Sequence, residues 1–173
     1  MQHLRLKESP IKPNKTRQSG FTLLEVMIVV AIIAILATIA IPSQNGAITQ
    51  KRVIESLELV DPYKTLIVAY YLSHGGEFPS DNEQAGLPEP DKIIGNYLEK
   101  LEVRKGVLHL YLGQKLPTQL HHKIVSLRPI FVKDSLASPV SWICGNNEIP
   151  QGMTAAGIDL TDLDVQFLPG RCR

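Results

Sequence analysis

The sequence predicts an α+β fold, in which a long N-terminal α-helix packs on a C-terminal antiparallel sheet of about four strands. Three observations predict it. Residues 21–41 form an uninterrupted apolar run, an amphipathic helical pattern extends from Ser43 to about Ser73, and short segments of alternating apolar and polar residues fill the region 97–144. The remainder, residues 145–173, is rich in Gly, Pro, Asn and Asp and is expected to form a long loop that Cys172 closes.

The apolar run from Phe21 to Ile41 has 21 residues and a single charge, Glu25. At ~1.5 Å per residue a helix of this length extends about 31 Å, enough to cross a hydrocarbon core of roughly 30 Å. A carboxylate at the centre of a membrane costs up to about 3 kcal/mol, so Glu25 indicates a functional site with a specific partner. Pro42 follows the run and is expected to kink or loosen the helix, because it cannot donate a backbone hydrogen bond.

Two other interpretations of the run compete with a functional membrane helix. An ordinary secretory signal peptide has an apolar core of ~7–15 residues before an A-x-A-like cleavage site, whereas this run is longer and contains Glu25. The second alternative is a plain single-pass anchor, which does not explain the carboxylate.

Residues 1–20 are polar and basic, and we expect them to form a disordered leader. They carry five basic side chains and one acid, for a net charge of +4. The whole chain has 18 basic and 17 acidic residues, which leaves 13 and 16, a net charge of −3, for the remainder. A basic flank before an apolar span predicts that the leader stays in the cytoplasm and that residues after Pro42 lie outside. The acidic remainder does not favour general nucleic-acid binding, which depends on neutralising phosphates.

The amphipathic helix is expected to present one apolar stripe to the sheet. Pro62 predicts a bend, and Gly75-Gly76 is expected to end the helix before a loop at residues 77–91. The predicted stripe consists of Ile54, Leu57, Val60, Ile67 and Tyr70.

Four strands are expected, at residues 97–104, 107–112, 123–132 and 140–144. Lys105-Gly106 predicts a hairpin turn between the first two strands. The alternation in the second strand predicts that its leucines face the helix. Pro129 is expected to limit the third strand to an edge of the sheet or to lie near a strand end.

The chain has two cysteines, Cys144 and Cys172. Outside the cytoplasm we expect them to be oxidised to a disulfide, which would close a loop of about 28 residues and stabilise the fold by roughly 3–4 kcal/mol. Two free thiols or a metal site are the alternatives, and a metal would need further ligands close by.

The segment Gly20-Phe21-Thr22-Leu23-Leu24-Glu25, with the apolar run and Pro42 behind it, resembles the class III signal of type IV prepilins and related pseudopilins. The resemblance implies that residues 1–20 are a removable leader, that Phe21 becomes an N-methylated first residue, and that Glu25 is the acid of the motif. Residues 21–42 would be the transmembrane and polymerisation helix. Residues 43–173 would be a globular domain, periplasmic at first and later on the cell surface.

The C-terminal segment is similar to that of type IVa pilins. Ser141-Trp142-Ile143-Cys144-Gly145 and the ending Phe167-Leu168-Pro169-Gly170-Arg171-Cys172-Arg173 correspond to segments that bracket the disulfide-bonded region in that family. The resemblance therefore implies a Cys144–Cys172 disulfide. Pseudopilins of type II secretion usually lack this pair of segments, which favours a true pilin.

The function implied by the resemblance is that of a structural subunit of a type IV pilus. A prepilin peptidase would cut after Gly20, and an inner-membrane assembly platform would polymerise the subunits into a retractile helical homo-oligomer. The chain would cross the inner membrane once, with a cytoplasmic N-terminus, before it enters the extracellular pilus. Adhesion, twitching motility and DNA uptake are implied equally. A minor pilin, a DNA-uptake pilin and a type II secretion pseudopilin are the alternatives.

Other site candidates are weaker. No P-loop, dinucleotide fingerprint or nucleophile elbow occurs, so we expect no enzyme and no cofactor. His121 and His122 are adjacent, and on a strand they would point to opposite faces, so no metal is expected there. Three aspartates in the C-terminal loop, Asp159, Asp162 and Asp164, lack the spacing of a calcium site. Two arginines near the C-terminus, Arg171 and Arg173, are too few to indicate DNA binding.

Overall fold

The computed structural model describes residues 20–40, 44–145 and 147–173. Residues 1–19 of the predicted leader and the kink expected at Pro42 lie outside the described residues. The chain divides into two compact units, Met1–Pro42 and Ser43–Arg173. Each is described separately below.

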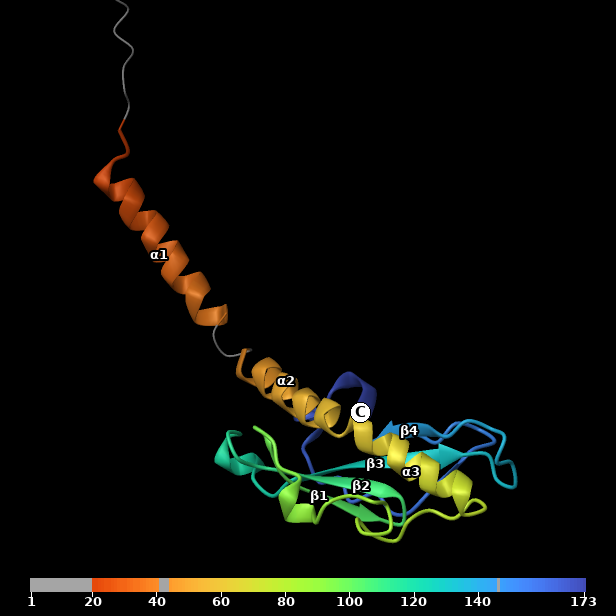
Figure 1. Cartoon of the computed structure of the whole chain (residues 1–173). Coiled ribbons are helices and arrows are strands. Elements are labelled where there is room, and N and C mark those ends of the chain that lie inside the picture. Colours follow the sequence, from red (N-terminus) through yellow and green to blue (C-terminus); the bar gives the residue numbers. More distant parts are fainter. Residues whose placement is uncertain (1–19, 41–43, 146) are drawn as a thin grey trace, which may run out of the picture. The chain divides into compact units, whose positions relative to one another are not determined.

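The first unit contains helix α1, Leu23–Ala40 (Figure 1). Its apolar side chains are exposed at successive positions of the helix, including Leu23 at 79%, Met27 at 64% and Leu36 at 60%. None of the helices described in residues 20–40, 44–145 and 147–173 combines the length and the apolar character of a membrane-spanning segment.

The second unit begins with two helices, α2 (Gln44–Leu59) and α3 (Asp61–Ser73). The predicted interruption is present, but it lies at Val60, two residues before Pro62. Pro62 lies in the first turn of α3, where a backbone N–H would have no acceptor within the helix, so proline does not disrupt it. The end of α3 was predicted correctly. Gly75 and Gly76 follow with φ of +65° and +95°, and the Gly76 N–H donates to the Tyr71 carbonyl at 2.9 Å.

The apolar stripe of α2 and α3 differs from the prediction at both ends. Leu57, Val60 and Ile67 are buried as expected, whereas Ile54 and Tyr70 are only half-buried. The positions that they were expected to fill are taken by the buried Val53 and Tyr71. In each helix the buried residue lies four positions, rather than three, from its buried neighbour: Val53 from Leu57 in α2, and Tyr71 from Ile67 in α3. Spacings of three and four both keep side chains on one helix face, so the sequence pattern alone does not distinguish them.

The sheet consists of five antiparallel strands, of which four form the path β1-β2-β3-β4. The strands are β1 Leu98–Arg104, β2 Val107–Leu112, β3 Ile124–Phe131, β4 Ser141–Cys144 and β5 Thr154–Ala155. The four predicted strands are confirmed to within one residue at each end. The β1–β2 turn has positive φ at both Lys105 (+50°) and Gly106 (+80°), the geometry that favours two-residue hairpins.

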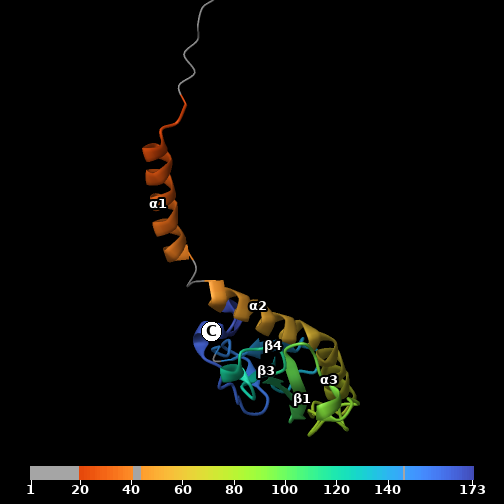
Figure 2. The ribbon, with the colours of Figure 1, turned by 90° about the vertical axis from the view of Figure 1, so that its left-hand side faces the viewer.

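Helices α2 and α3 lie on one face of the sheet (Figures 1 and 2). The three leucines of β2 point to this face, as predicted, and join one hydrophobic core with α2 and α3. This core also contains Leu101 and Val103 of β1 and Val125 and Leu127 of β3. Cross-strand registers such as Leu101↔Leu110 and Leu110↔Val125 place these side chains in rows on the same face.

The third strand lies inside the sheet, between β2 and β4, so the expectation of an edge strand at Pro129 is wrong. The other expectation, a position near a strand end, is correct. The last β2–β3 pair is Leu108↔Leu127, so Pro129 lies beyond the end of β2 while it still pairs with Trp142 of β4. The Pro129 carbonyl accepts from the Ala156 N–H at 2.9 Å, and the proline therefore needs no N–H toward β2.

The loop at residues 77–91 protects the outer edge of β1. Buried Asn82 accepts a hydrogen bond from the Val103 N–H at 2.7 Å, and its amide donates to the carbonyls of Leu101 and Pro88 at 3.1 and 2.9 Å. One side chain thus replaces a neighbouring strand over this part of the edge, which limits pairing with other chains.

Candidate functional site

The predicted processing residues and Glu25 lie together at the start of α1, whereas Pro42, the other predicted assembly residue, lies outside the described residues. Gly20 and Phe21 precede the helix, both are exposed, and Phe21 is 81% exposed. A side chain built on Gly20 would meet no atom within 4 Å. The peptide bond between Gly20 and Phe21 is therefore in an open, non-helical segment, where a peptidase could reach it.

Glu25 lies in the first turn of α1, where a negative charge interacts favourably with the helix dipole. Its backbone N–H donates to the Thr22 hydroxyl oxygen at 3.2 Å. Thr22 thus has the position and the hydrogen bond of a helix N-cap. This capping role was not predicted, although the Thr-x-x-Glu spacing is a sequence signal for it.

The two cysteines form the predicted disulfide. Cys144 ends β4, Cys172 belongs to the short helical turn Gly170–Cys172, and their Cα atoms are 4.8 Å apart. Both residues are buried in the hydrophobic core of the second unit. The bond therefore fixes the end of the chain to the last strand of the main sheet path.

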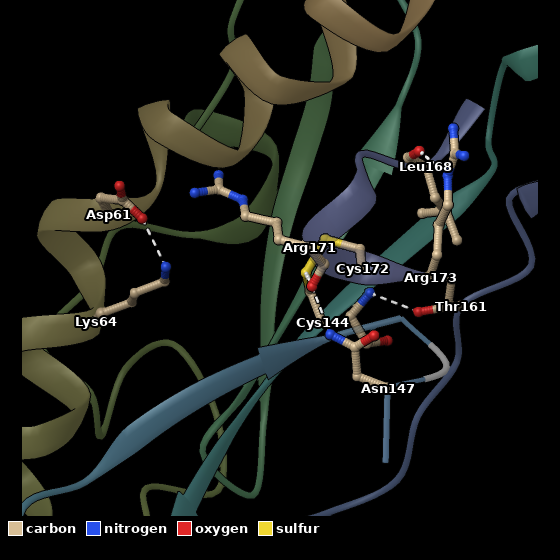
Figure 3. The surroundings of a disulfide bond; sticks show 10 residues. Asp61, Lys64, Cys144, Asn147, Thr161, Leu168, Arg171, Cys172 and Arg173 are labelled. Carbon is tan, nitrogen blue, oxygen red and sulfur yellow. Dashed lines mark hydrogen bonds and ion pairs between the residues drawn. A yellow bond between two sulfur atoms is a disulfide. The ribbon is translucent and has the colours of Figure 1, made fainter. Parts of the chain in front are cut away.

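Polar contacts around the disulfide hold the C-terminal segment in place (Figure 3). The Asn147 amide donates to the Arg171 carbonyl, and Arg173 Nε donates to the Leu168 carbonyl at 2.9 Å. Gly145, with φ of +61°, must be glycine because an added Cβ would overlap the Cys172 carbonyl. The Gln50 side chain of α2 donates to the Gln166 carbonyl at 2.6 Å, which ties the same segment to the helix.

A buried polar group occupies the sheet face opposite α2 and α3. His109 of β2 is 1% exposed, and its Nδ1 lies 2.9 Å from the hydroxyl of buried Ser126 on β3. That hydroxyl also accepts from the Leu160 N–H at 2.9 Å, and Thr161 Oγ1 accepts from the Ser126 N–H at 3.0 Å. Burial, together with the positive charge of Arg104, lowers the pKa of His109 from 6.5 to about 4. The imidazole is therefore neutral at physiological pH.

The aspartates of the C-terminal loop have structural partners. Asp159 lies 3.8 Å from Arg128, and Asp162 pairs with Lys123 at 3.1 Å and accepts from the Ile124 N–H at 2.6 Å. Asp164 accepts from the Gln166 amide at 3.3 Å. These contacts attach residues 159–164 to β3 and to the adjoining loop.

The two adjacent histidines lie in the turn before β3 rather than on a strand. His121 Nε2 is 2.9 Å from the Leu116 carbonyl, whereas His122 Nδ1 is 2.8 Å from a carboxylate oxygen of Glu99. Their rings therefore have separate partners. Over the described ranges, no group of three or more His, Cys, Asp or Glu side chains could hold a metal ion.

Two family models match successive parts of the chain. Residues 15–41 match the prokaryotic N-terminal methylation motif, and residues 51–173 match pilin, a bacterial filament. The first match covers Gly20, Phe21 and Glu25, and the second covers both cysteines.

Similar proteins are named for filaments or for prepilin processing. A fimbrial protein of Neisseria meningitidis serogroup B (strain ATCC BAA-335 / MC58) is 32% identical over 166 residues, 91% of this chain and 95% of that protein. A type IV major pilin protein, PilE1 of Neisseria gonorrhoeae, is 34% identical over 164 residues, 91% and 88% of the two chains. Prepilin peptidase-dependent protein D of Escherichia coli (strain K12) is 36% identical over 94 residues, 54% and 63% of the two chains.

Proposed function

Because the chain belongs to the family of pilins, which form bacterial filaments, we propose that it is a structural subunit of a type IV pilus. The observation that carries this proposal is the exposed apolar surface of α1. Met27 and Leu36 on the helix are 64% and 60% exposed, and Phe21 just before it is 81% exposed. An isolated subunit in water would be penalised for such a surface, so it must be covered by lipid or by other copies of the helix. The role is that of a structural polymer and not of an enzyme.

The first step in the proposed pathway is processing at the start of α1. A prepilin peptidase cuts between Gly20 and Phe21, removes residues 1–20, and the new amine of Phe21 is N-methylated. The match to the N-terminal methylation motif and the open conformation of this segment support the step. Cleavage places a positive charge four residues before Glu25, close to the start of the helix.

Before assembly, residues 21–42 serve as a single-pass anchor in the inner membrane, with the N-terminus in the cytoplasm. The run of 21 residues with one charge and the basic leader support this stage. Residues 43–173 form the globular domain, which is periplasmic first and extracellular in the filament. An inner-membrane assembly platform then transfers the helix from lipid into the filament.

Glu25 sets the register of assembly in this proposal. Its carboxylate is poorly solvated in the membrane and pairs with the Phe21 amine of a neighbouring subunit in the helical bundle of the filament. A buried ion pair adds little net stability, but loss of one partner costs roughly 3–5 kcal/mol, which disfavours wrong registers. Pro42 would loosen the junction that follows the helix. The resulting homo-oligomeric pilus serves adhesion, twitching motility or DNA uptake.

Mass spectrometry and N-terminal sequencing of fibres sheared from cells test the function. We expect an abundant chain that starts at methylated Phe21 and is lighter by the two hydrogen atoms lost in the disulfide. The same processed chain confined to membranes, or present only in traces in fibres, would indicate a minor pilin or a pseudopilin instead. A chain that keeps residues 1–20 would refute the proposed processing.

A further inference from the structure

A groove opens between the end of α2 and the segment that leads into β1. Its volume is about 630 Å³. Leu59, which is 43% exposed, and Ile94, which is 61% exposed, line the groove together with half-buried Tyr97. A Cβ at Gly95 would lie only 2.5 Å from a terminal methyl of Leu59, so a larger residue there would displace the Leu59 side chain. The groove therefore has an apolar part and is shaped by a close approach of two segments.

Two carboxylates lie on the wall of this groove. Glu55 accepts a hydrogen bond from the Asn96 amide at 3.1 Å, which fixes its position. Glu58 is exposed and forms no ion pair with any described residue. The groove thus combines apolar side chains with two negative charges, and its occupant should be apolar and basic.

A surface of the opposite character lies at the β1–β2 turn, and we call it the hairpin patch: Arg104, Lys105 and Ile158. Arg104 is paired with Glu102 at 2.8 Å, so Lys105 supplies the unpaired positive charge of the patch. Ile158 is 74% exposed, more than any other large apolar side chain described in residues 44–173. Its neighbour Gly157 lies against the turn, because a Cβ there would be 3.3 and 3.5 Å from the carbonyls of Arg104 and Lys105. Lys105 is exposed and has no ion-pair partner in the described ranges.

We propose that the hairpin patch of one subunit docks in this groove of a second copy of the chain. Ile158 would lie beside Leu59 and Ile94, and Lys105 would lie opposite Glu58. The proposal rests on the proposed function, because it names a contact between globular domains of one filament. Opposite charges and matching apolar side chains make the two surfaces complementary, and they select the register of neighbouring subunits.

The patch cannot fill the groove of its own subunit. Leu98 lines the groove at the first residue of β1, whereas Arg104 is the last residue of that strand. A strand of seven residues separates these ends by roughly 20 Å at ~3.3 Å per residue. The contact therefore joins two different surfaces of two copies, and such head-to-tail contacts produce open helical filaments when they do not close into a ring.

Charge reversal in the full chain, expressed in cells that assemble filaments, tests the contact. Lys105→Glu and Glu58→Lys should each lower the yield of sheared filaments about tenfold, because like charges would meet in the groove. The double variant restores opposite charges and should return the yield to near that of the unmodified chain. Lys133→Glu is the control, since Lys133 is also exposed and has no ion-pair partner among the described residues. We expect it to assemble normally.

Single variants that match the Lys133→Glu control, or a double variant no better than the singles, would overturn the contact. In either case the proposed function would stand as long as the unmodified chain is found in filaments. Its absence from filaments would refute the function itself.

Cross-linking gives a second test that does not depend on filament yield. A chain with Glu58→Cys and Lys105→Cys should form a ladder of multimers when its filaments are treated with a bismaleimide. The buried Cys144–Cys172 disulfide does not react. A chain with Glu58→Cys and Lys133→Cys should give no ladder. Filaments of the first chain that also give no ladder would show that another surface, or another partner, occupies the groove.

Discussion

Side-chain burial on the second face of the sheet depends on segments far apart in the sequence. The alternation of β2 places His109 away from α2 and α3, but it does not reveal that the chain near Leu160 covers it. In the fold, the Ser126 hydroxyl contacts both His109 and the Leu160 N–H. A histidine on a strand was therefore predictable, whereas a buried neutral histidine was not.

The low pKa of His109 predicts that acid destabilises the globular domain. An unfolded chain binds a proton at His109 near its ordinary value of 6.5, but the folded chain does so only near pH 4. The free energy of unfolding attributable to this group should be constant above pH 6.5, fall as the pH decreases from 6.5 to 4, and level off below pH 4. The total loss is about 3 kcal/mol, from ~1.4 kcal/mol for each pKa unit. Denaturant unfolding of the full chain in detergent, measured from pH 7.5 to 3.5, checks this dependence.

The matched variant is His109→Leu, which removes the titrating group and keeps a side chain of similar size. It should be less stable at pH 7 by about 1–2 kcal/mol, because Ser126 loses a hydrogen-bond partner. Its stability should depend less on pH between 6.5 and 4. The prediction would be wrong if both chains lost the same free energy over that interval.

At the scale of elements, local patterns predicted most of the fold. Strands β1 to β4 could be placed because each has its own alternation, and the Lys105-Gly106 turn could be placed because few residue pairs favour positive φ. The two-residue strand β5 could not be predicted. It is too short for a pattern, and it forms only because Ala155 pairs with Ile130, which is 25 positions earlier in the sequence.

The candidate site was predictable to a similar extent. The sequence indicated the residues at the start of α1 and both cysteines through local motifs. It did not indicate how residues 159–162 attach to the first residues of β3, because those hydrogen bonds join Asp162 to Ile124 and Thr161 to Ser126 across long stretches of chain. Sequence reasoning therefore located the candidate residues better than the contacts that hold the C-terminal segment.

The C-terminal segment is expected to depend on its disulfide. Two cysteines separated by 28 positions close a loop whose cross-link is worth roughly 3–4 kcal/mol in the chain-entropy model. The double variant Cys144→Ala/Cys172→Ala should lose about this free energy of unfolding, as measured with denaturant in detergent. Reduction of the disulfide in the unmodified chain by a thiol should likewise destabilise it and lower the denaturant concentration at the unfolding midpoint. If the double variant retained the stability of the unmodified chain, the hydrogen bonds of Asn147 and Arg173 would be sufficient to fix the segment.

At the scale of the whole molecule, the two units differ in where they place their apolar side chains. The second unit buries its apolar side chains in one core, whereas the first exposes apolar side chains such as Val29 and Ile33 at 49% and 59%. The apolar surface of α1 is therefore stable only when lipid or other protein molecules cover it. Glu25 is the only charged residue between Phe21 and Ile41, so in the proposed filament it is the residue that would pair α1 with a specific neighbour.

Substitution of Glu25 separates a role in the helix from a role between subunits. The local role is to begin α1, where the Thr22 hydroxyl accepts the Glu25 N–H and the carboxylate lies in the first turn. Glutamine supports a capping box as glutamate does, but it carries no charge. If the charge pairs with the Phe21 amine of a neighbour, Glu25→Gln and Glu25→Ala should both be cleaved after Gly20 and should both lower filament yield by tenfold or more, as the loss of roughly 3–5 kcal/mol per buried pair implies.

The yield of sheared filaments and the mass of the membrane-bound chain measure these two properties separately. Thr22→Ala is the control for the helix start, because it removes the cap and keeps the carboxylate. It should cost about 1 kcal/mol of helix stability and leave most of the filament yield. Normal yield from Glu25→Gln together with a low yield from Glu25→Ala would assign Glu25 to the helix start, and recognition between subunits would then depend on the apolar surface of α1 and on contacts between the globular domains.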